Sequence, residues 1–318
     1  MAKKARKVDL DHLERVVEEI VRRMDVIEEF SKAADHVEGL GGMETDRFGI
    51  AVATVDGALV LGGDAEVPFP IQSISKVFAL TLALRAFGDA VWKRVGREPS
   101  GDPFNSIVDL ERHKGIPRNP FINPGALVVC DIVLGRAKDH GGHADVRAFL
   151  EHHVGEKKLG RRDEIVTEDG KGAGFQNRAM ANLAKAFDNL HHDVEAVMKL
   201  YAEQCAIELS CRQLALAGRY LMHDGIDGKA EDPQADARLS RRINALMMTC
   251  GQYDGSGEFA YRVGLPAKSG VGGGILAIAP DIASIAVWSP TLDENGNSLL
   301  GTLALEQLTT RMGWSVFG

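Results

Sequence analysis

Apolar side chains recur at helical spacing near the start of the chain and then change to the spacing of strands. Between Leu10 and about Ala34 they fall every three or four positions, which predicts an amphipathic helix with a charged outer face. Two short apolar runs follow, 48–55 and 58–62, separated by Asp56-Gly57. Because an Asp-Gly step between apolar runs favours a tight turn, the runs predict a β-hairpin.

The pattern is helical from Ser73 to about Arg242 and returns to strands near the end. Alternating apolar and charged stretches fill the central part of the chain. The runs 274–279 and 283–288 are short, apolar and bounded by glycine or proline, so they predict strands. The segment 298–312 has the periodicity of a closing amphipathic helix.

This order of elements predicts an α+β, multi-domain architecture. One lobe would combine a sheet and flanking helices from about 1–72 and 251–318, with an all-helical lobe inserted at about 73–250. We expect a substrate cleft where the two lobes meet.

Composition limits the partners that the protein can have. The 318 residues are 45% hydrophobic and 26% charged, which is typical of a globular protein, and the formal net charge is −8. An acidic protein is a poor fit to nucleic acid or to an anionic membrane. No apolar run is long enough to span a bilayer, and the basic start of the chain lacks the apolar core of a signal peptide.

The cysteines and paired histidines do not have the spacing of a metal site. Four scattered cysteines form no C-x-x-C pair: Cys130, Cys205, Cys211 and Cys250. We therefore expect reduced thiols and a cytoplasmic location. The pairs 152–153 and 191–192 are adjacent histidines, whose side chains diverge, so we interpret them as loop or helix-start residues and expect no metal.

Ser73 and Lys76 form the sharpest local motif, at the start of an apolar helical segment. Residues three apart on a helix share one face, so a neutral lysine can take the proton from the serine hydroxyl and make it a nucleophile. The helix start also points main-chain N–H groups toward a developing oxyanion. The alternative is that Ser73 caps the helix and Lys76 is a solvated charge, and the short motif alone does not exclude it.

A second motif, Lys268-Ser269-Gly270, precedes the predicted strand 274–279. In penicillin-recognising serine hydrolases, a Ser-x-x-Lys pair works with a Lys-Ser/Thr-Gly on the edge strand. That strand supplies a main-chain N–H to the oxyanion hole and a cation near the substrate. A phosphate-binding loop is the rival interpretation of the glycines, but the spacing fits neither known pattern and a strand follows rather than a helix.

The third motif of the penicillin-recognising enzymes, S-x-N or Y-x-N, is missing from the helical block. Several multi-residue blocks instead resemble, in type and order, the serine-dependent glutaminase family: 72–78, 100–106, 115–126, 253 with 257–260, and 268–274. The resemblance runs from about Ile50 to the C-terminus. It implies a β-lactamase/transpeptidase-like fold with an antiparallel sheet, a single catalytic domain over 1–318, and hydrolysis of L-glutamine to L-glutamate and ammonia. It also implies a homo-oligomer, dimer or tetramer, that needs no cofactor.

The resemblance assigns roles to residues in the matching blocks. Ser73 would be the nucleophile, Lys76 its proton partner, and Tyr253 a catalytic residue beside them. The residues implied to bind substrate are Ser73, Asn123, Glu168, Asn177, Tyr201, Tyr253 and Val271, the last through its main chain in the oxyanion hole. A glutamate suits the substrate ammonium, while asparagines and a tyrosine suit its carboxylate and amide.

Two other functions stay open on the sequence alone. One is a hydrolase of the same fold that acts on another amide or ester, such as a β-lactam. The other is a non-catalytic amino-acid-binding protein that keeps the pocket. Ammonia release from glutamine and asparagine, measured beside hydrolysis of a chromogenic β-lactam, separates these functions.

The chain departs from the family pattern at His36. Family members usually carry Tyr-Ile-Pro after the N-terminal helix, and this chain has Asp35-His36-Val37-Glu38 instead. That tyrosine lines the substrate pocket, so the departure implies an altered pocket mouth. The alternative is a surface loop histidine.

If His36 takes the place of the tyrosine, His36→Tyr should change the Michaelis constant for glutamine and flatten its variation across about pH 6 to 7. An imidazole becomes cationic in that range, whereas a phenol does not. The turnover number should move less. A pH series of both parameters checks this, and superimposable curves would make His36 a bystander.

Overall fold

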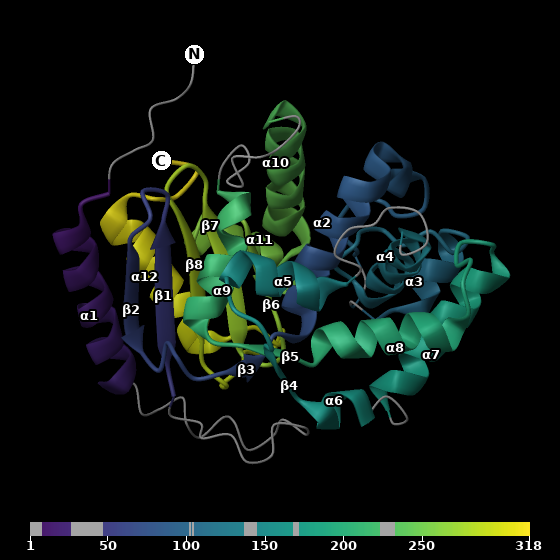
Figure 1. Ribbon diagram of the computed structural model, residues 1–318, viewed down its shortest axis with the longest axis horizontal. Coiled ribbons are helices and arrows are strands. Elements are labelled where there is room, and N and C mark those ends of the chain that lie inside the picture. Colours follow the sequence, from purple (N-terminus) through teal and green to yellow (C-terminus); the bar gives the residue numbers. More distant parts are fainter. Residues whose placement is uncertain are drawn as a thin grey trace. The chain divides into compact units, whose positions relative to one another are not determined.

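The computed structural model describes residues 8–26, 47–101, 103, 105–136, 145–167, 172–222 and 233–318. The chain folds into two compact units (Figure 1). We call 1–69 with 209–318 the sheet unit and 70–208 the helical unit.

Each unit has its own set of elements. Those of the sheet unit are α1 (Leu10–Val26), β1 (Gly49–Thr54), β2 (Leu59–Gly63), α9 (Cys211–Ala217), η5 (Gly218–Leu221), α10 (Pro233–Cys250), η6 (Tyr253–Gly255), α11 (Ser256–Arg262), β6 (Ala267–Ser269), β7 (Gly274–Ala279), β8 (Ala283–Trp288) and α12 (Leu299–Met312). Those of the helical unit are η2 (Gln72–Ile74), α2 (Ser75–Phe87), η3 (Gly88–Lys93), α3 (Ile107–Arg112), α4 (Asn123–Arg136), α5 (Val146–Val154), β4 (Gly160–Arg161), α6 (Asp163–Thr167), α7 (Ala173–Ala186) and α8 (Val194–Cys205). The chain passes from one unit to the other within β3 (Phe69–Pro70) and β5 (Ile207–Leu209).

The sheet unit contains a five-stranded antiparallel sheet in the order β2-β1-β8-β7-β6. The predicted hairpin is confirmed, since β1 pairs with β2 in a register that places Ala51 opposite Leu61. Gly57 turns the chain with φ of +96°, a left-handed conformation that glycine adopts without steric cost. The predicted strands 274–279 and 283–288 are β7 and β8.

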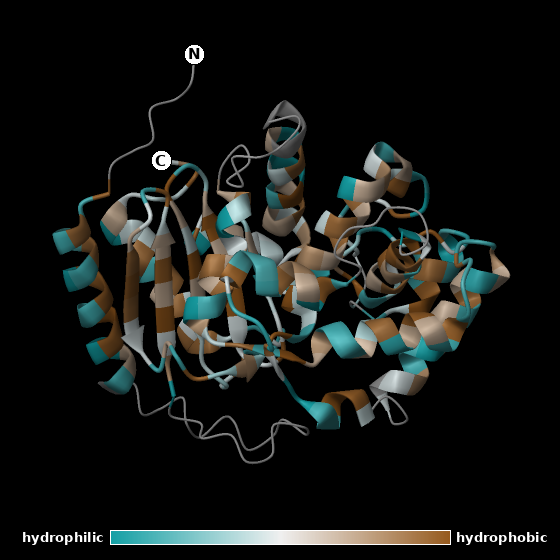
Figure 2. Cartoon of the chain, in the orientation of Figure 1, coloured by the Kyte–Doolittle hydropathy of each residue, from teal (hydrophilic) through white to brown (hydrophobic). Residues whose placement is uncertain are grey.

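The inner strands of this sheet are buried on both faces, because every position of β1, β7 and β8 is buried. Side chains such as Ile50, Ile275 and Ile285 join one core with residues of α1 and α12. Figure 2 shows apolar residues along the strands, while hydrophilic and hydrophobic residues alternate along α1. Burial on both faces explains why the strands are continuous apolar runs rather than alternating ones.

Helix α9 and the turn η5 cover the other face of the sheet. A Cβ on Gly218 would lie 2.5 Å from Ser284 Oγ and 2.7 Å from Leu276 Cδ1, so a larger residue would push the chain off the strands. The segment 209–250 therefore belongs to the sheet unit. The sequence pattern predicts instead that the helical lobe extends to about 250. The physical reason is that a sheet with two apolar faces needs helices on both of them.

Helix α1 begins as predicted, and its buried side chains Leu13, Val17, Ile20 and Met24 repeat every three or four positions. It is described as far as Val26, and the rest of the predicted helix, to about Ala34, lies outside the described residues. None of the helices in the described part of the chain has the length and apolar character that crossing a bilayer requires.

Two helices form the interior of the helical unit. Helix α4 contacts α2, α7 and α8, and both α2 and α4 are buried on nearly all sides. A helix that is apolar all round belongs inside a domain. Polar side chains on these helices are therefore out of water, and they need partners within the protein.

Candidate functional site

Ser73 lies in η2, the 3₁₀ turn directly before α2, and its side chain is half-buried. Neither η2 nor α2 has a side-chain cap hydrogen bond, which argues against Ser73 being only a helix cap. The preceding residue, Gln72, has a φ of +45°. The neighbouring Ser75 is fully buried, and its Oγ donates to the Gln72 carbonyl at 2.7 Å. Of these two serines, only Ser73 has a partly accessible side chain.

Lys76 is not a solvated charge, because its side chain is only 1% exposed. Its Nζ donates to the Asn123 Oδ1 at 2.7 Å and to the Phe121 carbonyl at 3.2 Å. It also lies 5.8 Å from the centroid of the Tyr201 ring. Burial disfavours the charged form and lowers the pKa of Lys76 to about 8. A substantial fraction of this amine is therefore neutral at mildly alkaline pH.

Two thiols, Cys130 and Cys205, lie beside this lysine. Burial raises the pKa of both thiols, so they are protonated at neutral pH. The Cys205 Sγ contacts Ser75 Oγ at 3.9 Å, and the Cys130 Sγ donates to Gln204 Oε1 at 3.7 Å. Within the described part of the chain, no ionised carboxylate is among the groups that lower or raise the pKa of Lys76, and burial is the largest cause of its lowered pKa.

Asn123, the first residue of α4, is hydrogen-bonded to side chains of three other helices. Its Oδ1 accepts from Lys76 and, at 3.3 Å, from the Tyr201 hydroxyl, while its Nδ2 donates to the Asn177 Oδ1 at 3.1 Å. Asn177 is on α7 and Tyr201 is on α8, and both are buried. Four residues that the sequence analysis singled out, far apart in the chain, therefore form one hydrogen-bonded cluster. We call Lys76, Asn123, Asn177 and Tyr201 the lysine cluster.

The turn before α4 holds Asn123 in place. The Asn119 side chain accepts from the N–H groups of Phe121 and Ile122 and donates to the Glu98 carbonyl. A Cβ on Gly125 would lie 1.9 Å from the Asn119 carbonyl oxygen, so only glycine permits this close approach. The backbone at Asn123 is therefore fixed independently of its own side-chain contacts.

In the sheet unit, the structure brings Tyr253 and Val271 close together. A Cβ on Gly296 would lie 3.7 Å from Val271 Cγ1 and 4.0 Å from Tyr253 Cε2, so both side chains border this glycine. None of the hydrogen bonds between described residues uses the Val271 N–H, although the turn around it is bonded through Gly270 and Gly273. A main-chain donor of this kind is what an oxyanion hole requires.

Lys268 is not an accessible cation. Its side chain is 0% exposed, and its Nζ donates to the carbonyls of Ser269 at 2.7 Å and Gly251 at 3.0 Å. The same atom lies 4.4 Å from the centroid of the Tyr253 ring. The motif predicts a cation near the substrate, whereas the structure buries the Lys268 ammonium against the Tyr253 ring.

Two predicted residues, Glu168 and His36, lie outside the described residues. His152 and His153 lie in the last turn of α5, rather than in a loop or at a helix start, whereas His191 and His192 precede α8. Asp131, which is fully buried, accepts from the N–H groups of His191 and His192 and pairs with Arg94. Burial acts to raise the pKa of Asp131, but these hydrogen bonds outweigh it and hold that pKa below its usual value. No group of metal-ligating side chains occurs among the described residues.

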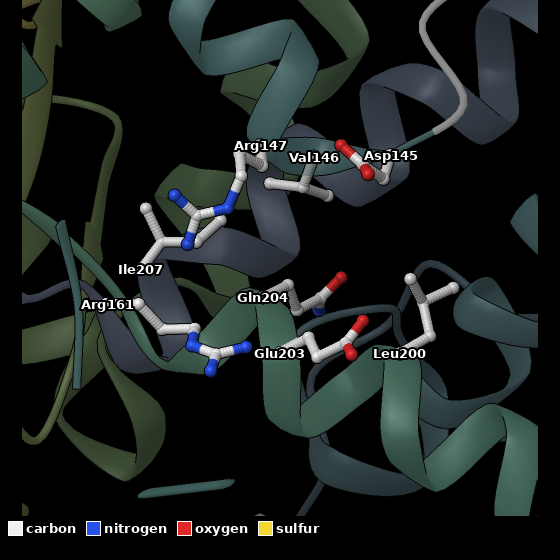
Figure 3. Close-up of a pocket in the computed structure, with 8 residues that line it drawn as sticks. All are labelled: Asp145, Val146, Arg147, Arg161, Leu200, Glu203, Gln204 and Ile207. Carbon is white, nitrogen blue, oxygen red and sulfur yellow. The ribbon is translucent and has the colours of Figure 1, made fainter. Parts of the chain in front are cut away.

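The helical unit also has a pocket of about 190 Å³ where the start of α5, strand β4 and the end of α8 meet (Figure 3). Its guanidinium groups are engaged elsewhere, since Arg147 donates to the Leu159 carbonyl at 2.6 Å and Arg161 pairs with Asp163. None of the predicted site residues that the structure describes lines it. This pocket is therefore not the candidate active site.

Sequence reasoning missed Asn119, Gly251 and Asn297, which position the site. Asn297 accepts from Ser269 Oγ at 2.6 Å and donates to the Gln252 carbonyl at 3.2 Å. The Asn119 position lies inside a block that was singled out as a whole, so a signal existed there. Nothing in the local sequence distinguishes Gly251 or Asn297 from ordinary turn residues.

Comparison with known proteins points to one family. The family model described as glutaminase matches residues 31–317. A glutaminase from Rhodopseudomonas palustris (strain HaA2) is 52% identical over 97% of this chain and 99% of its own length. One from Methylobacterium radiotolerans is 52% identical over 98% of this chain and 99% of its own length.

Solved structures agree. A Bacillus subtilis probable glutaminase has a TM-score of 0.81 at 32% identity, covering 94% of this chain and 97% of the other. The Bacillus subtilis glutaminase YbgJ, solved as a covalent complex with 5-oxo-L-norleucine formed by reaction with 6-diazo-5-oxo-L-norleucine, has a TM-score of 0.79 at 30% identity. It covers 96% of this chain and 99% of the other.

The lysine cluster makes a prediction about stability. Asn123→Ala removes the acceptor of Lys76 and Tyr201 and the donor to Asn177, and so leaves buried polar groups without partners. The free energy of unfolding should fall by about 1–3 kcal/mol. Urea unfolding measures this. The matched control is Asn182→Ala on the exposed face of α7, where Asn182 donates only to the Arg178 carbonyl of its own helix. Equal losses in the two variants would show that the cluster adds nothing.

Proposed function

Because the chain belongs to the glutaminase family and hydrolyses L-glutamine to L-glutamate and ammonia, we propose that it does so through an acyl-enzyme on Ser73. The observation that carries this proposal is the state of Lys76. It is buried and has a lowered pKa, and it lies three residues after the only partly accessible serine of the motif. These are the properties that a lysine needs to act as a general base.

The hydrogen bonds of Lys76 suit the neutral amine. A neutral amine has two N–H groups and one lone pair, and the two N–H groups are matched by the Phe121 carbonyl and the Asn123 Oδ1. The lone pair is then left to accept a proton. Asn123 therefore serves the base by fixing its orientation as well as by supporting the cluster.

In the proposed reaction, Ser73 Oγ attacks the carbon of the substrate side-chain amide while its proton passes to Lys76. The carbonyl oxygen becomes an oxyanion. Collapse of this intermediate breaks the C–N bond, and the leaving group takes the proton from Lys76 and departs as ammonia. Water then attacks the glutamyl ester with Lys76 again as base, and glutamate and the free serine are released.

We assign Tyr253 and Val271 to the same reaction, on the basis of the family resemblance. Tyr253 would exchange a proton with the reacting groups, and the Val271 N–H would bind the oxyanion. Support comes from the sheet unit itself, where both residues border Gly296 and where the Val271 N–H is not used by the described residues.

Substrate recognition is proposed to use the polar groups around the base. Asn123, Asn177 and Tyr201 would bind the carboxylate and amide of glutamine, and Glu168 its ammonium. Asn123 is hydrogen-bonded to both Asn177 and Tyr201, so the protein itself fixes the geometry of these three groups. Preformed polar groups favour the ligand that matches them, because any other leaves them unpaired.

We also propose a homo-oligomer, dimer or tetramer, in a cytoplasmic setting. Ile107 and Val108 of α3 and Phe175 of α7 are exposed, and these two helices contact each other. Gathered apolar side chains on a surface are typical of interfaces. Cys130, Cys205 and Cys211 are buried free thiols, which suits a reducing compartment.

Ser73→Ala should abolish covalent labelling by 6-diazo-5-oxo-L-norleucine and lower turnover of glutamine by about 10⁴-fold or more, because no other group replaces the nucleophile. Mass spectrometry of the digested protein locates the adduct. Ser75→Ala is the matched control from the same motif, and it should still be labelled at Ser73. An adduct on another residue, or a folded Ser73→Ala protein with near-normal turnover, would refute the assignment.

The lowered pKa of Lys76 predicts how activity depends on pH. A base must be neutral, so kcat/KM should rise with pH and level off above about 8, the pKa of Lys76. Lys76→Met should remove this rise of kcat/KM with pH along with most of the activity. Lys199→Met, which removes an exposed lysine of α8, should retain both the pH dependence and the activity. A rise of kcat/KM with its midpoint at about pH 6.5, the usual pKa of a histidine, would contradict the assignment.

A further inference from the structure

We propose that Lys268 is a positioning residue for Tyr253, holding the ring of that residue and the turn that carries it in the conformation used in the reaction. The proposal rests on the function proposed above for Tyr253. It differs from the role that the Lys-Ser-Gly motif suggests by itself, which is a cation that contacts the substrate.

The Lys268 ammonium lies against the ring of Tyr253. Lys268 lies on β6, the edge strand, opposite Leu276 of β7, and its side chain is fully buried. The Nζ lies 4.4 Å from the centroid of the Tyr253 ring, within the range of a cation–π interaction. An ammonium over the ring restricts where the ring can move, since tilting it away forfeits this attraction.

The same ammonium binds the main chain just before the turn that carries Tyr253. Its Nζ donates to the Gly251 carbonyl at 3.0 Å, and that carbonyl also accepts from the Ser269 N–H at 3.2 Å. A Cβ on Gly251 would lie 1.8 Å from the Ala267 carbonyl oxygen, so glycine is needed for the end of α10 to approach β6 this closely. The turn that carries Tyr253 is therefore attached to the edge strand two residues before the tyrosine.

The backbone at Tyr253 is strained. Its φ is +50°, a left-handed conformation that is unfavourable for a residue with a bulky side chain. Such a conformation persists only where the surroundings fix it. Gln252 before it accepts from the Asn297 Nδ2 through its carbonyl, and the Tyr253 carbonyl accepts from Ser256 Oγ at 2.9 Å. Lys268 supplies the contact that joins this turn to the ring itself.

Lysine suits this position chemically. If the Tyr253 oxygen gains negative charge as it exchanges a proton, a cation against the ring stabilises that state more than the neutral phenol. Lys268 thus acts on the rate of the reaction through Tyr253 rather than on substrate affinity.

A double-mutant cycle tests this inference with the full-length protein. Lys268→Gln keeps a hydrogen-bond donor but removes the charge, so kcat for glutamine should fall by about 10-fold or more with KM changed by less than about 3-fold. In the Tyr253→Phe background the same change should cost less than about 3-fold in kcat, because the hydroxyl that Lys268 serves is gone. Lys268→Arg retains the charge and should recover part of the lost kcat.

Several results would overturn the inference. An equal loss of kcat in both backgrounds would show that Lys268 acts independently of Tyr253. A raised KM with unchanged kcat would show that its ammonium contacts the substrate. A folded Lys268→Gln protein with wild-type kcat would show that the cation is unnecessary. Tyr253→Phe with wild-type kcat would instead refute the proposed function of Tyr253, and the inference with it.

Two measurements guard against a folding defect. Thermal unfolding and circular dichroism of each variant report the fold. Ser284→Ala on β8 is a control for a change inside the same sheet, because Ser284 is fully buried and its Oγ has no partner among the described residues. If Lys268→Gln is not recovered folded, the cycle is run with Lys268→Arg. The inference then requires that the kcat loss of that variant also shrink in the Tyr253→Phe background.

Discussion

The burial of the Lys76 amine is the constraint on which the helical unit depends. An ammonium out of water is costly unless it is partnered, and the cost is reduced when the amine is neutral. The partners are the Phe121 carbonyl and the Asn123 side chain, which lie in a turn held by Asn119 and permitted by Gly125. The contacts that hold α2 against α4 are therefore also the contacts that orient Lys76 as a general base.

A comparable arrangement occurs in the sheet unit. Lys268, like Lys76, is buried, donates to at least one main-chain carbonyl and lies over a tyrosine ring. Of the non-glycine residues with positive φ, Gln72 directly precedes the proposed nucleophile and Tyr253 is itself a proposed catalytic residue. Strained conformations are retained where function requires them and the surroundings enforce them. In the helical unit the strained Gln72 lies close to the buried lysine in the sequence, and in the sheet unit the buried lysine lies against the ring of the strained Tyr253.

Much of the fold was predictable from local patterns. The hairpin, β7, β8 and the beginning of α1 follow from periodicity and turn residues, and the family follows from several separate blocks. The predicted C-terminal boundary of the helical lobe was wrong. Helix α9 has the same local pattern as the helices before it and differs only in that it packs on the sheet. Which helix covers the second face of a sheet is a long-range property, and periodicity within one helix does not encode it. The same holds for Asn297, whose role depends on Ser269 and Gln252.

The Ser-x-x-Lys motif shows most clearly where sequence reasoning reaches its limit. The motif is compatible with a capped helix and a solvated lysine, and equally with a nucleophile and its base. The quantity that separates them is the exposure of Lys76, and residues 45 to 125 positions further along the chain determine it: Phe121, Asn123 and Tyr201. A short catalytic motif thus owes its chemistry to distant segments that remove it from water. This is why the separate blocks of the family, rather than the motif alone, were needed to assign the site.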